Sequence, residues 1–183
     1  MKLDVDRLIA DCYDAIDDRA PTKAVREVLA RTVADPAAVV AALGTPERGG
    51  IQKLHVSDKL TVINVIWSPG MMIMPHNHNM WAAIGVYGGR EDNIFWRRLK
   101  DEPNGLIEAA GAKSLGPKDV RPLGDDIIHS VSNPTRQFTA ALHVYGGDFF
   151  TEERSEWDPL SLEEAPYDID KNVALFERAN SQL

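Results

Sequence analysis

Cysteine is nearly absent from the 183-residue chain, which contains only Cys12. A single cysteine can form neither an internal disulfide nor a zinc site built from several thiolates. Its spacing from Leu8 and Ile16 is typical of a buried position on a helix. We therefore expect the chemistry of this protein to depend on side chains other than thiols.

Long hydrophobic runs and dense basic runs are also missing. No segment approaches the roughly 18 consecutive apolar residues of a membrane span, and the acidic N-terminal segment lacks the apolar core of a signal peptide. With 28 acidic against 20 basic residues the formal net charge is −8, which disfavours binding to the phosphates of nucleic acids. We expect a cytoplasmic protein that binds neither a membrane nor nucleic acid.

The hydrophobic pattern divides a single domain, residues 1–183, into three parts. Residues 1–48 are predicted to be a helical N-terminal extension, because their apolar residues recur at helical spacing. Residues 49–158 carry short β-type runs separated by glycine- and proline-containing turns, which indicates an antiparallel sandwich or barrel. Residues 159–183 form a tail that ends in a short helix. The β-type runs are 60–67, 71–75, 81–87, 94–98, 126–131 and 137–145.

Three histidines are placed so that they can share a metal ion. His76 and His78 are two residues apart, and side chains at i and i+2 of a strand point to the same face. His129 lies on another β-type run that a barrel can bring alongside. Three neutral imidazoles leave coordination positions open for a substrate, as catalytic iron and zinc sites require. The alternative is a chance His-x-His on a polar strand face, with His129 a hydrogen-bonded core residue.

The surroundings of these histidines resemble the two cupin motifs. The run GMMIMPHNH, which ends in His76 and His78, matches the first motif, and GPKDVRPLG followed by His129 resembles the second, with two extra residues before the histidine. The resemblance implies a mainly β fold, a double-stranded β-helix or jelly-roll-like barrel, with N-terminal helices and a short C-terminal helix. It also implies that the three histidines bind the metal inside the barrel.

One departure from the usual cupin pattern narrows the resemblance. Ala82 and Ala83 stand where most cupins carry a glutamate ligand, as in a three-histidine subclass. The segment HNHNMWAAIGVYGGRED and the later segments LHVYGGDFF and RSEW are similar to those of bacterial thiol dioxygenases, over residues 50–160 in all. This similarity implies an Fe(II) cofactor, with Zn or Ni possible in a purified sample. It also implies a reaction of a small-molecule thiol with O2 that gives a sulfinic acid.

The same resemblance implies roles for four more residues. The family pattern Ser-x-His-x-Tyr places a tyrosine hydroxyl beside the iron and a histidine that orients it, here Tyr145 and His143. Ala141 replaces the family serine, so the outer hydroxyl of this relay is missing. Arg154 and Gln52 match an arginine and a glutamine of enzymes of 3-mercaptopropionate type. A substrate with a thiol and a carboxylate, 3-mercaptopropionate or cysteine, is therefore expected.

Other interpretations stay open at this point. Arg154 can instead form a salt bridge in its acidic surroundings, and His143 and Tyr145 can simply pack in the core. The chain can be a three-histidine cupin enzyme that acts on a carbon substrate, or a non-catalytic metal-dependent module that binds a small molecule. Barrel edges and N-terminal helices offer surfaces for a homodimer, and a monomer is equally compatible with the sequence.

Overall fold

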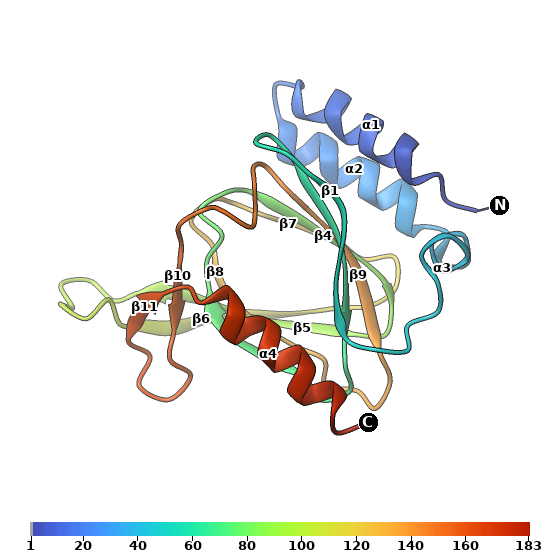
Figure 1. Cartoon of the computed structure of the whole chain (residues 1–183). Helices are drawn as coiled ribbons and strands as arrows, with labels where there is room; N and C mark the ends of the chain where they lie inside the picture. The colour runs from blue at the N-terminus through green and yellow to red at the C-terminus, as the bar shows by residue number, and fades with distance from the viewer. Residues whose placement is uncertain (1) are drawn as a thin grey trace.

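The protein is described over residues 2–183 by a computed structural model with two antiparallel sheets flanked by helices (Figure 1). The helices are α1 (Val5–Ile16), α2 (Pro21–Val33), α3 (Pro36–Leu43) and α4 (Ile169–Asn180). The strands are β1 (Gly50–Val56), β2 (Thr61–Trp67), β3 (Met72–His76), β4 (Ala82–Gly88), β5 (Glu91–Arg98), β6 (Ile107–Leu115), β7 (Val120–Leu123), β8 (Ile128–Ser132), β9 (Thr139–Tyr145), β10 (Ser155–Trp157) and β11 (Glu164–Pro166). The predicted mainly β architecture with helices at both ends is confirmed.

The two sheets have the strand orders β1-β2-β9-β4-β7 and β11-β10-β3-β8-β5-β6. Strands that are distant in sequence are neighbours in both sheets, and every pairing is antiparallel. In Figure 1 the sheets face each other and enclose the barrel interior. This is the double-stranded β-helix that the resemblance to the cupin motifs implies.

The N-terminal helices cover the outer face of the first sheet (Figure 1). Asp4 and Asp35 accept hydrogen bonds from the first turns of α1 and α3, which satisfies backbone N–H groups that a helix start leaves free. α2 packs so closely on β4 that a Cβ at Gly85 would lie 3.1 Å from the side chain of Val33. The small residue therefore sets the distance between helix and sheet.

Strand β9 is buried at each of its seven positions, because both of its faces are covered. Leu142 and Val144 point outward and pack with the N-terminal helices. Ala141, His143 and Tyr145 alternate with them and face the barrel interior, as the period of two along a strand requires. The structure thus places the predicted His143–Tyr145 pair on the inner surface.

Helix α4 lies across the barrel at the end away from the N-terminal helices (Figure 1). Phe176 is buried against the inner core, where its ring stacks on Trp67 with the ring centroids 5.5 Å apart. The tail also contains β11, which pairs with β10 and extends the second sheet beyond the predicted end of the barrel at residue 158. The C-terminal segment is therefore part of the barrel wall.

None of the described helices is long and apolar enough to span a membrane.

The accessibility of the Cys12 thiol can be used to test the packing of α1. The thiol is fully buried on α1, and burial, with a smaller contribution from Asp11, raises its pKa to about 12. Because the thiolate is the reactive form, we expect no labelling of the native protein by an aromatic disulfide reagent at mildly alkaline pH. Full labelling is expected in guanidinium chloride, and Cys12→Ser should give none. Rapid labelling of the native protein would contradict this placement.

Candidate metal centre

The three predicted ligands converge on the inner surface of the barrel. His76 is the last residue of β3 and pairs across the sheet with His129 of β8. The ring centroids of these two residues are 4.7 Å apart, and that of His78 is 5.0 Å from His129. One nitrogen from each of the three imidazoles lies within 4.8 Å of the other two. The group therefore comes together in the folded chain as the sequence predicts.

The spacing suits a single metal ion. The Nε2 atoms of His78 and His129 are 3.3 Å apart. Two nitrogens that are each about 2.1 Å from one ion are separated by roughly 3.0–3.4 Å at angles between square and tetrahedral. Ala82 faces the same interior and offers no ligand atom, so the described residues provide three imidazoles and no carboxylate ligand.

His78 reaches the site by a different route from the one predicted. β3 ends at His76, so His78 lies in the following loop rather than on the strand. The loop is attached to the neighbouring segment, since Asn77 exchanges two hydrogen bonds with Ser155 and the Asn79 side chain donates to the carbonyl of Glu153. Asn79 adopts a left-handed φ of 53°, a conformation that asparagine tolerates better than most residues. These contacts fix the loop that carries His78.

Hydrogen bonds outside the cluster orient two of the rings. Nδ1 of His76 donates to the carbonyl of Met74 at 3.0 Å, and Nδ1 of His129 lies 2.7 Å from Oδ1 of Asn93. A donor at Nδ1 leaves the lone pair on Nε2, and such outer partners orient metal-binding histidines in known metal sites. His76 and His129 therefore both present Nε2 to the shared position.

Burial keeps the three imidazoles uncharged. Loss of hydration lowers the pKa of His76 to about 4. The same cause, with added repulsion from neighbouring imidazoles, holds the pKa values of His78 and His129 well below their ordinary range. A histidine must be neutral to bind a metal. The donor set is thus in its metal-binding form at neutral pH and fits a divalent metal.

Tyr145 and His143 stand beside the ligands. The Tyr145 ring meets the His78 ring edge to face, with the centroids 5.0 Å apart. Its hydroxyl is 3.0 Å from Nδ1 of His143. Burial raises the pKa of Tyr145 well above its usual value, so the hydroxyl keeps its proton. The predicted pair therefore lines the cavity beside the candidate metal centre, with the tyrosine hydroxyl protonated.

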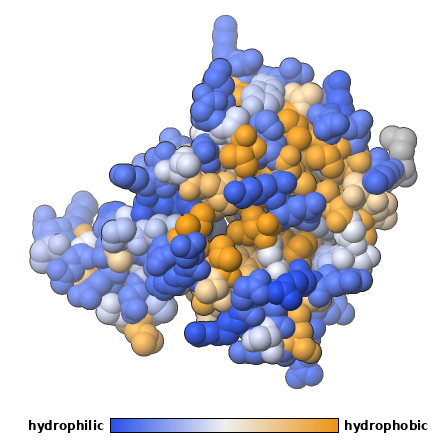
Figure 2. Space-filling view, viewed as in Figure 1, coloured by the Kyte–Doolittle hydropathy of each residue, from blue (hydrophilic) through white to orange (hydrophobic). Residues whose placement is uncertain are grey.

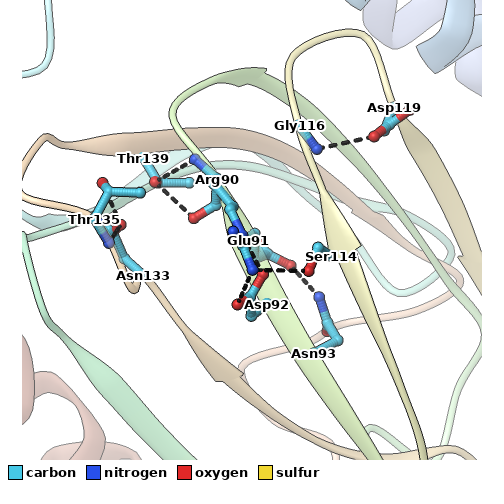
Figure 3. Close-up of polar contacts among 10 residues, drawn as sticks. All are labelled: Arg90, Glu91, Asp92, Asn93, Ser114, Gly116, Asp119, Asn133, Thr135 and Thr139. Atoms are coloured by element: carbon cyan, nitrogen blue, oxygen red, sulfur yellow. Dashed lines mark hydrogen bonds and ion pairs between the residues drawn. The ribbon is translucent and has the colours of Figure 1, made fainter.

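A buried acid that the sequence did not reveal lies behind this pair. Glu91 at the start of β5 is fully buried, and its carboxylate accepts a hydrogen bond from Trp67 at 3.0 Å. It accepts a second one from Asn93 at 2.9 Å (Figure 3). Burial raises its pKa, but the nearby His143 and these hydrogen bonds outweigh burial and lower it overall. The predicted strand began only at residue 94. The i, i+2 spacing of Glu91 and Asn93 was the available signal that they share a face.

A cavity of about 270 Å³ opens onto the metal ligands. On the face shown in Figure 2, hydrophobic residues surround a hollow near the centre of the view. Apart from the histidines and Tyr145, most of the cavity wall is aliphatic or aromatic. It includes Ile51, Ile63, Val65, Trp67, Ile73, Val131, Phe149, Phe150, Tyr167, Ile169, Val173 and Phe176, with Lys53, Asp170 and Asn172. The site therefore has an apolar interior, with charge confined to a few wall residues.

Arg154 lies directly behind the cavity wall. Its guanidinium is stacked between the rings of Phe149 and Tyr167, at 4.0 and 4.1 Å from the ring centroids, and donates to the Phe149 carbonyl. Both rings line the metal-site cavity, whereas Arg154 lines a separate hollow on the other side of them. It is buried and forms no salt bridge with a described acidic residue, so the surface alternative does not hold.

Gln52 is not brought to the site. Successive residues of a strand face opposite sides, and its neighbours Ile51 and Lys53 line the cavity. Gln52 instead lies on the other side of β1, where it accepts a hydrogen bond from Asn64 at 3.2 Å. Among the described residues of the cavity wall, Lys53 is the only lysine or arginine. Its ammonium lies 3.7 Å from the centre of the Phe150 ring.

Comparison with solved structures gives weak similarities, one of them to a protein with a double-stranded β-helix domain. Oxalate decarboxylase from Bacillus subtilis is 17% identical over 58% of this chain and 27% of that one, with a TM-score of 0.44. An uncharacterized protein with a double-stranded β-helix domain from Klebsiella pneumoniae is 12% identical over 68% and 88%, with a TM-score of 0.42. A Bacillus halodurans protein is 16% identical over 55% and 72%, with a TM-score of 0.47.

No family model matches the sequence. The chain spans about a quarter of the length of the oxalate decarboxylase chains that it matches. The fold class therefore depends on the strand order and pairing described above, and the site on the geometry of its own residues. The chain folds as a double-stranded β-helix barrel with a three-histidine metal-binding group on its inner surface.

Loss of one ligand should abolish stoichiometric metal binding. We expect His129→Ala, dialysed against a divalent metal and measured by plasma mass spectrometry, to retain far less than one ion per chain. His55→Ala is the matched control, because His55 bonds Tyr13 outside the barrel and its loss should leave the stoichiometry unchanged. Equal metal contents in the two variants would show that the ligands lie elsewhere.

Proposed function

We propose that the protein is a non-haem Fe(II)-dependent thiol dioxygenase that converts a small thiol carboxylate and O2 into a sulfinic acid. The observation that carries this proposal is a group of three imidazoles without a carboxylate ligand, with the ring of Tyr145 packed against that of His78. The reaction balances as one thiol and one O2 giving one sulfinic acid, with both oxygen atoms bonded to sulfur.

The residues of the chain have distinct tasks in this reaction. Bound Fe(II) would lower the pKa of the thiol and supply the redox chemistry for its reaction with O2. His76, His78 and His129 would hold the ion and leave one side open to the cavity. The apolar wall excludes water from the reacting sulfur. Tyr145, whose hydroxyl contacts His143, contributes a polar group to the cavity wall beside the bound substrate.

The direct test of this activity is to measure O2 consumption and sulfinate formation with three thiols. Fe(II)-loaded protein should consume O2 with 3-mercaptopropionate or cysteine, and cysteamine serves as the analogue that lacks a carboxylate. With isotopically labelled O2, mass spectrometry should find both labelled atoms in the sulfinate. The His129→Ala variant should give only the background rate. A chain that binds iron but forms no sulfinate from any of the three thiols would refute the activity.

The substrate carboxylate has two candidate partners in the structure. Lys53 lines the cavity, whereas Arg154 lies behind the Phe149 and Tyr167 rings and reaches a substrate only if this stack rearranges. In the proposed function Arg154 binds the carboxylate, because a guanidinium forms two parallel hydrogen bonds with it.

Arg154→Gln and Lys53→Gln therefore form a matched pair. A hydrogen bond to a charged group contributes about 1.5–3 kcal/mol, so we expect Arg154→Gln to raise KM for 3-mercaptopropionate about tenfold or more. KM for cysteamine should change little. If Lys53→Gln produces that selective effect and Arg154→Gln does not, the carboxylate binds at the lysine. Equal effects on both substrates would remove the proposed role of the arginine.

The size of the cavity favours a second candidate, a dioxygenase that acts on a carbon substrate. A cavity of about 150 Å³ accommodates benzene, which has as many heavy atoms as 3-mercaptopropionate. The cavity here has a volume of about 270 Å³ and a mostly apolar wall, which leaves room for a larger apolar molecule. O2 consumption with aromatic diols or β-diketones, together with none from the thiols, would favour this candidate.

A further inference from the structure

The carboxylate of Glu91 is the least expected group in the barrel interior. It is fully buried, and it accepts hydrogen bonds from Trp67 and Asn93. No lysine or arginine of the described chain pairs with it; its nearest basic group is Nε2 of His143, 3.6 Å from Oε2. A buried charge without a full ionic partner is unfavourable for folding, and an apolar residue would serve stability better. Its position therefore calls for a functional explanation.

Two chains of contacts lead from this carboxylate to the metal centre. The first runs through Asn93, whose Nδ2 donates to Glu91 at 2.9 Å and whose Oδ1 lies 2.7 Å from Nδ1 of the ligand His129. The second runs through His143, which faces Glu91 with Nε2 and Tyr145 with Nδ1. One side chain thus contacts the partners of two different groups at the site.

The chemistry of the contacts fixes the direction of each hydrogen bond. A carboxylate only accepts, so Asn93 must turn its amide nitrogen toward Glu91 and its oxygen toward His129. The oxygen then requires a hydrogen on Nδ1 of His129, which leaves the lone pair of Nε2 for the metal. In the second chain Nε2 of His143 lies 3.6 Å from the carboxylate, which is too long for a hydrogen bond, and the negative charge favours a hydrogen on this nitrogen by electrostatic attraction. Nδ1 of His143 then accepts the Tyr145 O–H, and the lone pairs of that hydroxyl are free to face the cavity.

We propose that Glu91 is a positioning residue that sets the tautomers of His129 and His143 and thereby orients the metal ligand and the Tyr145 hydroxyl together. Ala141 lies two residues before His143 on the same face of β9 and has no polar atom to perform this task. The proposal rests on the metal centre and not on thiol oxidation, and it holds for either candidate substrate.

Nitrogen NMR of the zinc-loaded protein with ¹⁵N-labelled histidine tests the proposal without any variant. The shifts of the imidazole nitrogens report which nitrogen carries the hydrogen. We expect a hydrogen on Nδ1 of His129 and on Nε2 of His143, with Nδ1 of His143 unprotonated. A hydrogen on Nδ1 of His143, in either charge state, would overturn the proposal.

Glu91→Gln provides the causal test, because the amide keeps the shape of the side chain but can also donate. We expect the His143 tautomer, and in the metal-free protein also the His129 tautomer, to become mixed or reversed, and the metal affinity to fall about 10- to 100-fold, the usual effect of losing such an outer partner. Glu156→Gln is the control. Glu156 is also buried, but its side-chain partners are Lys171, Asn172 and the backbone of Asp168.

The two variants separate positioning from general stability. Both are expected to unfold at a lower temperature than the original chain, and only Glu91→Gln should change the histidine nitrogen shifts and the metal affinity. A folded Glu91→Gln protein with unchanged tautomers and affinity would refute the proposal. If the wild-type protein shows the expected tautomers but does not oxidise thiols, the proposed function is wrong and the proposal for Glu91 stands.

Discussion

The burial of β9 on both faces is the constraint on which the rest of the structure depends. Because side chains alternate along a strand, its outward residues join the core beneath the N-terminal helices while His143 and Tyr145 are held toward the barrel interior. A slip of one residue would exchange the two sets and place polar groups under the helices. The hydrophobic outer layer thus fixes the register that the inner site needs, although the N-terminal helices lie on the opposite face of the sheet.

Much of this arrangement could be predicted from the sequence, and the exceptions have physical causes. His76, His78 and His129 are identified by their motif surroundings, and the helices by their apolar spacing. β1, β6, β7, β10 and β11 were not predicted. β1 and β6 are edge strands that are largely exposed and lack the alternation of a half-buried strand, and the other three are only three or four residues long. The position of His78 in a loop depends on contacts with a segment about 75 residues away in sequence, which no local pattern contains.

For the site residues, too, the sequence predicts what depends on local spacing and misses what depends on contacts between distant segments. The spacing of His143 and Tyr145 predicts a shared face, and the structure makes that face the inner one. For Arg154, sequence similarity gives the residue but not the two rings that enclose it. Gln52 was assigned by similarity alone, yet the strand parity of β1 turns it away from the cavity. Glu91 illustrates the largest gap, because the burial of an acid follows only from the packing of two sheets against each other.

Helix α4 supplies Ile169, Val173 and Phe176 to the cavity wall, whereas the ligands come from β3, β8 and the loop after β3. Part of the cavity wall is thus contributed by a stretch of the chain that carries no metal ligand. Changes in the last fifteen or so residues can enlarge, narrow or recharge the chamber while the histidines keep their places. Divergent substrate ranges can therefore arise in such a barrel through its C-terminal segment, with the reactive centre inherited intact.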